Sequence, residues 1–165
     1  MRLISDDGAS IDLSIVDYQF PSAPAGRQPG DIEDWDANWL MIRGAVHTAD
    51  GLEWDFTEPC LTTREAAELH LFLRQIAAPD VSGVADRRHQ ELTLEFTEPE
   101  LAFTSADVES DPRTVEVRLS YGAAPRLSLR QPDVDGTTVS VRMSSRAWRS
   151  AAHAWATELM AYPQR

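Results

Sequence analysis

Alternation of apolar and polar residues marks most of the strands that this chain predicts. In residues 10–18, Ile11, Leu13 and Ile15 alternate with polar neighbours. A period of two is typical of a strand with one buried face. The same pattern predicts five further strands, at residues 91–96, 101–103, 114–121, 127–129 and 138–144.

A hairpin is predicted between residues 38 and 56. Near the start of residues 38–48, apolar side chains occupy both the odd and the even positions. This pattern is typical of a central strand that is covered on both faces. Asp50 and Gly51 then favour a tight turn. Residues 52–56 follow with apolar and acidic side chains in strict alternation.

Helical spacing replaces alternation in two places. Thr62 and Glu65 have the spacing of a capping box at the start of the first helix, and Pro79 ends it. Ser144 or Ser145 can cap the second helix. The apolar stripes are Ala66, Leu69, Phe72, Leu73 and Ile76 in the first helix and Trp148, Ala152, Trp155 and Leu159 in the second.

The order of these elements predicts an α+β fold, with mainly antiparallel β-sheet, one helix between two β blocks and a C-terminal helix. The 165 residues suit a single domain, residues 1–165. Within it, residues 19–37 are rich in proline, glycine and acids and predict a long surface loop.

The tetrapeptide Phe-Thr-Glu-Pro occurs twice, at residues 56–59 and 96–99. The sequences around the two copies diverge, so a duplicated domain is not expected. A structural interpretation is that proline ends a strand in each copy. The alternative is an enzyme or small-ligand-binding protein with a pocket near Glu58, Glu98 and Cys60, in which the glutamates form an acid–base pair and the thiol is a nucleophile.

The net charge of the chain indicates which kinds of partner it can attract. The chain has 27 acidic residues against 15 arginines and no lysine, a formal net charge of −12. Such a field repels nucleic acid and favours a basic protein partner, although acidity also serves solubility alone. The four histidines are scattered, and no motif predicts a metal, a cofactor or a catalytic residue.

Several features predict a cytoplasmic protein that does not enter a membrane. Cys60 is the single cysteine, so no internal disulfide can form. The first residues lack the pattern of a signal peptide, and no apolar run is long enough to span a bilayer.

An acidic stretch in the predicted loop is the candidate for partner binding. Asp31, Glu33, Asp34 and Asp36 surround Trp35. An aromatic anchor ringed by carboxylates suits an arginine- or lysine-rich surface. A solvated loop without a binding role is the alternative.

Three segments resemble the WapI-like immunity proteins of bacterial toxin–immunity systems. They are "DANWLMIRGAV", "EPCLTTREAAEL" and "LEFTEPELAF". The resemblance implies a non-enzymatic protein that binds and neutralises a cognate toxin domain, commonly a nuclease, with no cofactor. The residues that match the family pattern are interpreted as fold residues: Trp39, Trp54, Pro59, Leu61, Thr62 and Glu65.

An acidic immunity protein that docks on a basic toxin is therefore the leading hypothesis. The rivals are an enzyme or ligand-binding protein at the Phe-Thr-Glu-Pro segments, and a subunit of another assembly that uses the same acidity.

Overall fold

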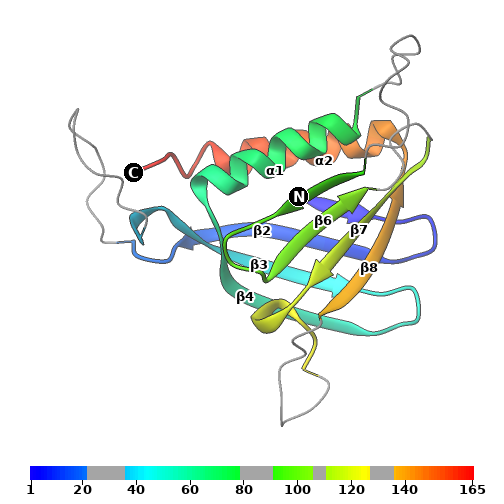
Figure 1. The fold of residues 1–165 in the computed structure, drawn as a ribbon, viewed down its shortest axis with the longest axis horizontal. Helices are drawn as coiled ribbons and strands as arrows, with labels where there is room; N and C mark the ends of the chain where they lie inside the picture. The colour runs from blue at the N-terminus through cyan, green and yellow to red at the C-terminus, as the bar shows by residue number, and fades with distance from the viewer. Residues whose placement is uncertain (22–35, 79–90, 106–110, 127–135) are drawn as a thin grey trace.

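The computed structural model describes residues 1–21, 36–78, 91–105, 111–126 and 136–165. Within these ranges the chain forms two antiparallel sheets of four strands each and two helices. Figure 1 shows the helices side by side along one side of the sheets, with the strands of the second sheet crossing in front of the first. The predicted α+β class is confirmed.

The N-terminal sheet contains four strands in chain order, β1 (Arg2–Ile4), β2 (Ser10–Tyr18), β3 (Trp39–His47) and β4 (Glu53–Thr62). Its buried face includes the alternating residues of β2, as predicted. The hairpin of β3 and β4 is also confirmed. Strand β1 was not predicted, because three residues are too few to show a period.

The C-terminal sheet contains β5 (Leu92–Glu95), β6 (Leu101–Ser105), β7 (Arg113–Leu119) and β8 (Thr137–Met143), again in chain order. Alternation predicted each of these four strands. The further strand predicted at residues 127–129 lies outside the described residues. The two sheets meet where the Asp6 N–H, just after β1, donates to the Arg142 carbonyl of β8 at 3.3 Å.

Strand β4 does not end at Pro59, and that prediction is wrong. Leu40 pairs with Leu61 and Ile42 pairs with Glu58, so two residues of β4 lie opposite one residue of β3. Pro59 is one of these two. A proline has no N–H to donate, and a bulge leaves a residue unpaired, so the strand continues past it to Thr62.

The two Phe-Thr-Glu-Pro segments therefore have different structures. The first lies inside β4, whereas the second follows β5 and enters the turn to β6. Only the second copy supports the interpretation of a motif at a strand end. Strand β3 is central as predicted, but its outward residues Trp39 and Met41 are only half-buried.

Both helices begin with the predicted caps. Helix α1 (Thr63–Ile76) has the complete capping box of Thr62 and Glu65, and α2 (Ser145–Leu159) begins with Ser144, whose hydroxyl accepts from the Ala147 N–H. The helices contact each other directly, since the Trp155 indole donates to the Ala66 carbonyl at 2.8 Å. Their apolar stripes join one core with the inner faces of both sheets.

Candidate functional site

The acidic stretch proposed for partner binding falls almost entirely outside the described residues. Asp31, Glu33, Asp34 and Trp35 belong to this group. Asp36 is described, and it begins the short helix η1 (Asp36–Asn38) with an exposed side chain.

Asn38, at the end of η1, connects the start of β3 to the C-terminal segment. Its side-chain amide donates to the Arg165 carbonyl at 2.9 Å and accepts from the Arg165 N–H at 2.8 Å. The Arg165 guanidinium lies 3.5 Å from the centroid of the Tyr18 ring. These contacts join Asn38 to Arg165 and, through the Arg165 side chain, to Tyr18 at the end of β2.

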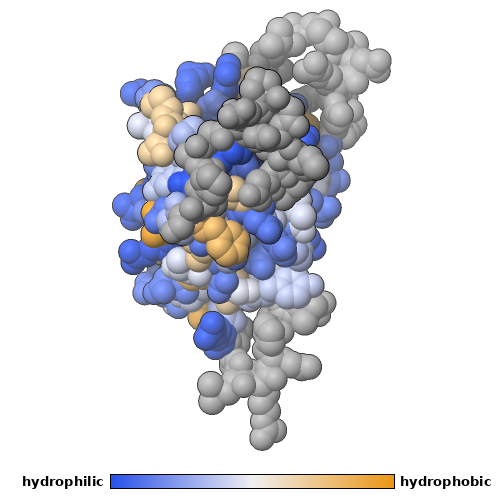
Figure 2. All heavy atoms as spheres, turned by 90° about the vertical axis from the view of Figure 1, so that its left-hand side faces the viewer, coloured by the Kyte–Doolittle hydropathy of each residue, from blue (hydrophilic) through white to orange (hydrophobic). Residues whose placement is uncertain are grey.

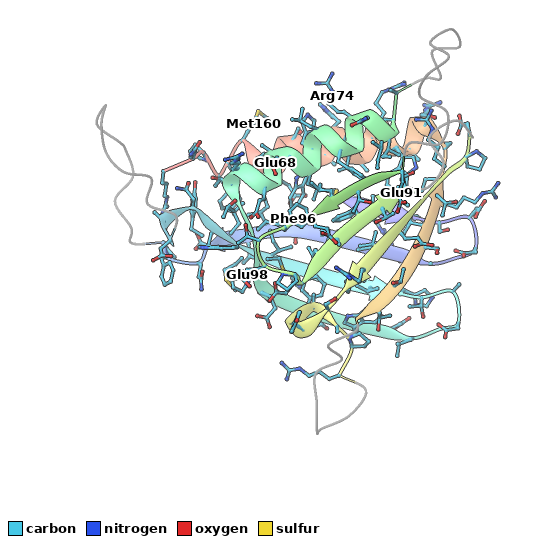
Figure 3. All side chains as sticks on the ribbon, viewed as in Figure 1. Glu68, Arg74, Glu91, Phe96, Glu98 and Met160 are labelled. Atoms are coloured by element: carbon cyan, nitrogen blue, oxygen red, sulfur yellow. The ribbon has the colours of Figure 1, made fainter. Side chains whose placement is uncertain are left out.

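Glu58 of the first Phe-Thr-Glu-Pro segment and Glu98 of the second both lie near enough to Glu100 for their charges to raise its pKa. We call these three residues the carboxylate cluster. Glu58 lies inside β4 and packs against Gly122 of the short helix η2 (Tyr121–Ala123). A Cβ atom at residue 122 would lie 2.6 Å from Glu58 Cδ, so a larger residue there would require the Glu58 side chain to move. Figure 3 shows Glu98 on the turn between β5 and β6.

Glu100 is the most desolvated member of the carboxylate cluster. Burial raises the pKa of this carboxyl group, its own backbone N–H partly offsets that rise, and the charges of Glu98 and Glu58 raise the pKa further. Its Oε2 atom is buried and has no hydrogen-bond partner among the described residues. Glu100 was not among the predicted site residues, because nothing in the sequence distinguishes it from other glutamates near a strand end.

Cys60 lies beside the carboxylate cluster but is fully buried. Burial raises the pKa of the thiol strongly, and the charges of Glu100 and Glu58 raise it further. A nucleophilic cysteine needs a lowered pKa and access to its substrate. The environment of Cys60 has the opposite properties, so the nucleophile hypothesis for this residue is not supported.

Glu65 fixes the second Phe-Thr-Glu-Pro segment in place. Its Oε2 accepts from the Thr62 N–H at 2.8 Å, and its Oε1 accepts from the Thr97 N–H at 2.7 Å. Burial alone would raise the pKa of Glu65, but these backbone hydrogen bonds hold it below its ordinary value. One carboxylate thereby joins the start of α1 to the turn that carries Glu98.

A hollow of about 480 Å³ lies on the outer face of the N-terminal sheet. We call it the strand hollow. It crosses all four strands, and its lining residues are Arg2, Ser10, Asp12, Ala45, Val46, His47, Glu53, Trp54 and Asp55. A second hollow of about 480 Å³ lies between β1 and α2 and is lined mainly by alanine and serine. Neither hollow includes Glu58, Glu98 or Cys60, so neither is the predicted catalytic pocket.

Exposed apolar side chains are dispersed over the described surface. Figure 2 shows one end of the molecule, where hydrophobic residues form small separate patches among hydrophilic ones. Ile4 and Val16 project from the outer face of the N-terminal sheet, with exposed fractions of 54% and 50%. On the helix layer, Arg74 and Met160 point away from the sheets (Figure 3).

Within the described ranges, no three or more His, Cys, Asp or Glu side chains form a group that could hold a metal ion. His47 contacts Glu53, with 2.8 Å between Nδ1 and Oε1, and His70 contacts the Ala152 carbonyl at 3.0 Å. Neither α1 nor α2 has the length and apolar character required to span a membrane.

Comparison with protein-family models identifies one that covers almost all of the chain. The model of the Immunity protein WapI-like family matches residues 2–163. The match includes residues 10–35, which lie outside the three resembling segments. Comparison with curated proteins finds none that matches this chain.

Proposed function

The chain belongs to the WapI-like immunity protein family, and from this premise we propose that it is a non-catalytic inhibitor that binds and neutralises a cognate toxin domain. The toxin is a nuclease with a basic surface, and inhibition occurs because the bound protein occludes that surface. Nucleases act on a polyanion and therefore need positive charge near their substrate. An acidic protein is the electrostatic complement of such a surface.

The observation that carries this proposal is the net charge of −12 in a chain that matches the family over residues 2–163. A field of this size accelerates association with a basic partner and disfavours acidic ones. The acidic stretch of Asp31, Glu33, Asp34, Trp35 and Asp36 remains a proposed contact within this scheme.

Catalysis at the Phe-Thr-Glu-Pro segments has less support. An acid–base pair requires substrate access between the two carboxyl groups. Glu58 instead packs closely over Gly122, and the nearby Cys60 thiol is buried. The carboxylate cluster therefore lacks the properties of an acid–base pair.

Co-expression tests the proposed function. Cells that produce the toxin domain encoded beside this gene should survive when they also produce this chain, and the two purified proteins should form a stable complex. The matched control is an immunity protein of similar size and charge from an unrelated system. Equal killing with and without this chain would refute the proposal.

A further inference from the structure

We propose that the outer face of the N-terminal sheet docks the toxin domain, with one arginine or lysine side chain of the toxin lying over Ala45 between Asp12 and Asp55. This inference rests on the proposed function and specifies the surface that performs it. The occupant is the basic face of the toxin domain.

Strand register creates a cation-sized space in the strand hollow. Arg2, Asp12, Ala45 and Asp55 are successive partners across β1, β2, β3 and β4, so they form one row on the outer face. Adjacent strands lie about 4.8 Å apart, which separates the Cα atoms of Asp12 and Asp55 by about 10 Å. Ala45 is the only residue between them, and its methyl group leaves the space above it open.

The carboxylates beside this space are available to a partner. The Asp12 carboxylate is 4.0 Å from Arg2 Nε, and these side chains are 53% and 67% exposed. An exposed ion pair of this length contributes little and is easily replaced. The Asp55 carboxylate is exposed, and no hydrogen bond or ion pair is seen for this side chain among the described residues. A guanidinium or ammonium group over Ala45 would lie between both carboxylates.

The next row adds a third acid and an apolar contact. Ile4, Ser10, His47 and Glu53 are successive partners across the same four strands. Glu53 lines the strand hollow and contacts His47, while the exposed Ile4 pairs with Ser10, another residue of the lining. Apolar contacts combined with charges that meet opposite charges are typical of a specific protein interface.

The outer face of the N-terminal sheet carries the exposed cations Arg2 and Arg43 against the exposed acids Asp12, Glu53 and Asp55, so acids are in excess. The other described faces are less suited to a cationic partner. On the C-terminal sheet, Arg118 is 3.6 Å from Glu95, and Arg142 is 2.8 Å from Asp6. Charges there are therefore largely balanced. The helix layer is basic, because its exposed arginines exceed its acids. These arginines are Arg64, Arg74, Arg146 and Arg149, against Glu68 and Glu158. A basic toxin is repelled from the helix layer and attracted to the strand hollow.

The first experiment fills the space over residue 45 with a cation that belongs to this chain. Ala45→Arg places a guanidinium between Asp12 and Asp55, which favours the fold and blocks the toxin side chain. Ser140→Arg is the matched control, since Ser140 is exposed on β8 and pairs with the acidic Glu116. We expect Ala45→Arg to weaken binding of the neighbouring-gene toxin domain by about 100-fold or more, and Ser140→Arg by less than about threefold.

A second pair of variants removes one negative charge without adding bulk. Asp55→Asn should weaken binding by about 30-fold, because the toxin cation loses a direct partner. Glu116→Gln removes the same charge from the outer face of the C-terminal sheet and should change affinity by less than about threefold. Circular dichroism and thermal melts check that all four variants fold. If Ala45→Arg does not fold, the Asp55 and Glu116 pair decides the question.

Each outcome has a definite meaning. If the wild-type protein binds the toxin and rescues cells, and all four variants bind with the wild-type affinity, the proposed face is wrong and the proposed function stands. If the wild type neither binds nor rescues, the proposed function fails, and this inference fails with it. If sedimentation shows a wild-type dimer that Ala45→Arg dissociates without loss of toxin affinity, the face binds a second copy of the chain, and the inference is overturned.

Discussion

The Glu65 carboxylate accepts a hydrogen bond from the Thr97 N–H at 2.7 Å across a separation of 32 residues. The same carboxylate completes the capping box of α1 through Thr62. A single buried side chain thus determines where a helix begins and how the turn between β5 and β6 lies against it.

Glu65→Gln should destabilise the protein by about 1–3 kcal/mol, since an amide cannot accept all the hydrogen bonds that the carboxylate accepts. Urea unfolding followed by tryptophan fluorescence measures the loss. The control is Glu68→Gln, one turn along the same helix, where the glutamate forms a surface pair with Arg64 at 3.1 Å. That change should cost less than about 0.5 kcal/mol.

Glu65 should also give stability a specific pH dependence. Its folded-state pKa lies below the ordinary value of a glutamate, so its contribution is present above that ordinary pKa of about 4.3 and is lost as pH falls through the lower folded pKa. The difference in unfolding free energy between wild type and Glu65→Gln should stay constant near neutrality and shrink below about pH 5. A difference that grows on acidification would contradict the assigned role.

Gly44 should tolerate no side chain. A Cβ atom at this position would lie 2.1 Å from Cε1 of Phe56, the residue directly opposite on β4. Gly44→Ala should therefore cost about 2–3 kcal/mol through displacement of the ring. In the Phe56→Leu background, the same change should cost clearly less. Equal costs in both backgrounds, measured by a double-mutant cycle, would show that the ring is not the obstacle.

Removal of the Glu100 charge should stabilise the protein. Burial and the charges of Glu98 and Glu58 raise its pKa, so the ionised form weakens the fold at any pH above that raised value. Glu100→Gln should increase the unfolding free energy at neutral pH by roughly 0.5–1 kcal/mol. The gain should disappear as pH falls and wild-type Glu100 becomes protonated. Thermal melts at several pH values measure both effects.

Charge reversal in the acidic stretch should affect the rate of complex formation. With Asp31, Glu33, Asp34 and Asp36 changed to lysine, association with the toxin domain should slow about tenfold or more and lose much of its salt dependence. Stopped-flow measurements at several salt concentrations give both quantities. Reversal of Glu95 and Glu116 on the C-terminal sheet, which changes the net charge by half as much, shows how far net charge alone alters the rate. Unchanged association rates would remove the acidic stretch from the interface.

Local patterns were sufficient to predict most elements of this fold. Alternation identified the long strands, and the spacing of Thr62 and Glu65 located the start of α1. These signals lie within a few residues of one another and depend only on local geometry. The division of the strands into two sheets depends on pairing between distant segments, which alternation alone does not encode.

The candidate surfaces were harder to predict for the same reason. The strand hollow requires the register that aligns Asp12, Ala45 and Asp55, and the carboxylate cluster requires Gly122 to approach Glu58. The prediction for Pro59 was wrong because Pro59 lies in a bulge of β4, opposite β3, where its missing N–H breaks no pair. A proline ends a strand only where its missing N–H would otherwise be paired.

Because Cys60 is fully buried, the reactivity of its thiol reports local opening of the folded protein. The chain has one thiol, and its side chain has no contact with solvent in the folded state. An alkylating reagent can therefore modify it only while the end of β4 separates from the core, and the modification rate counts those openings. Comparison of that rate in free and toxin-bound protein would show, without any engineered label, how much toxin binding suppresses the opening of β4.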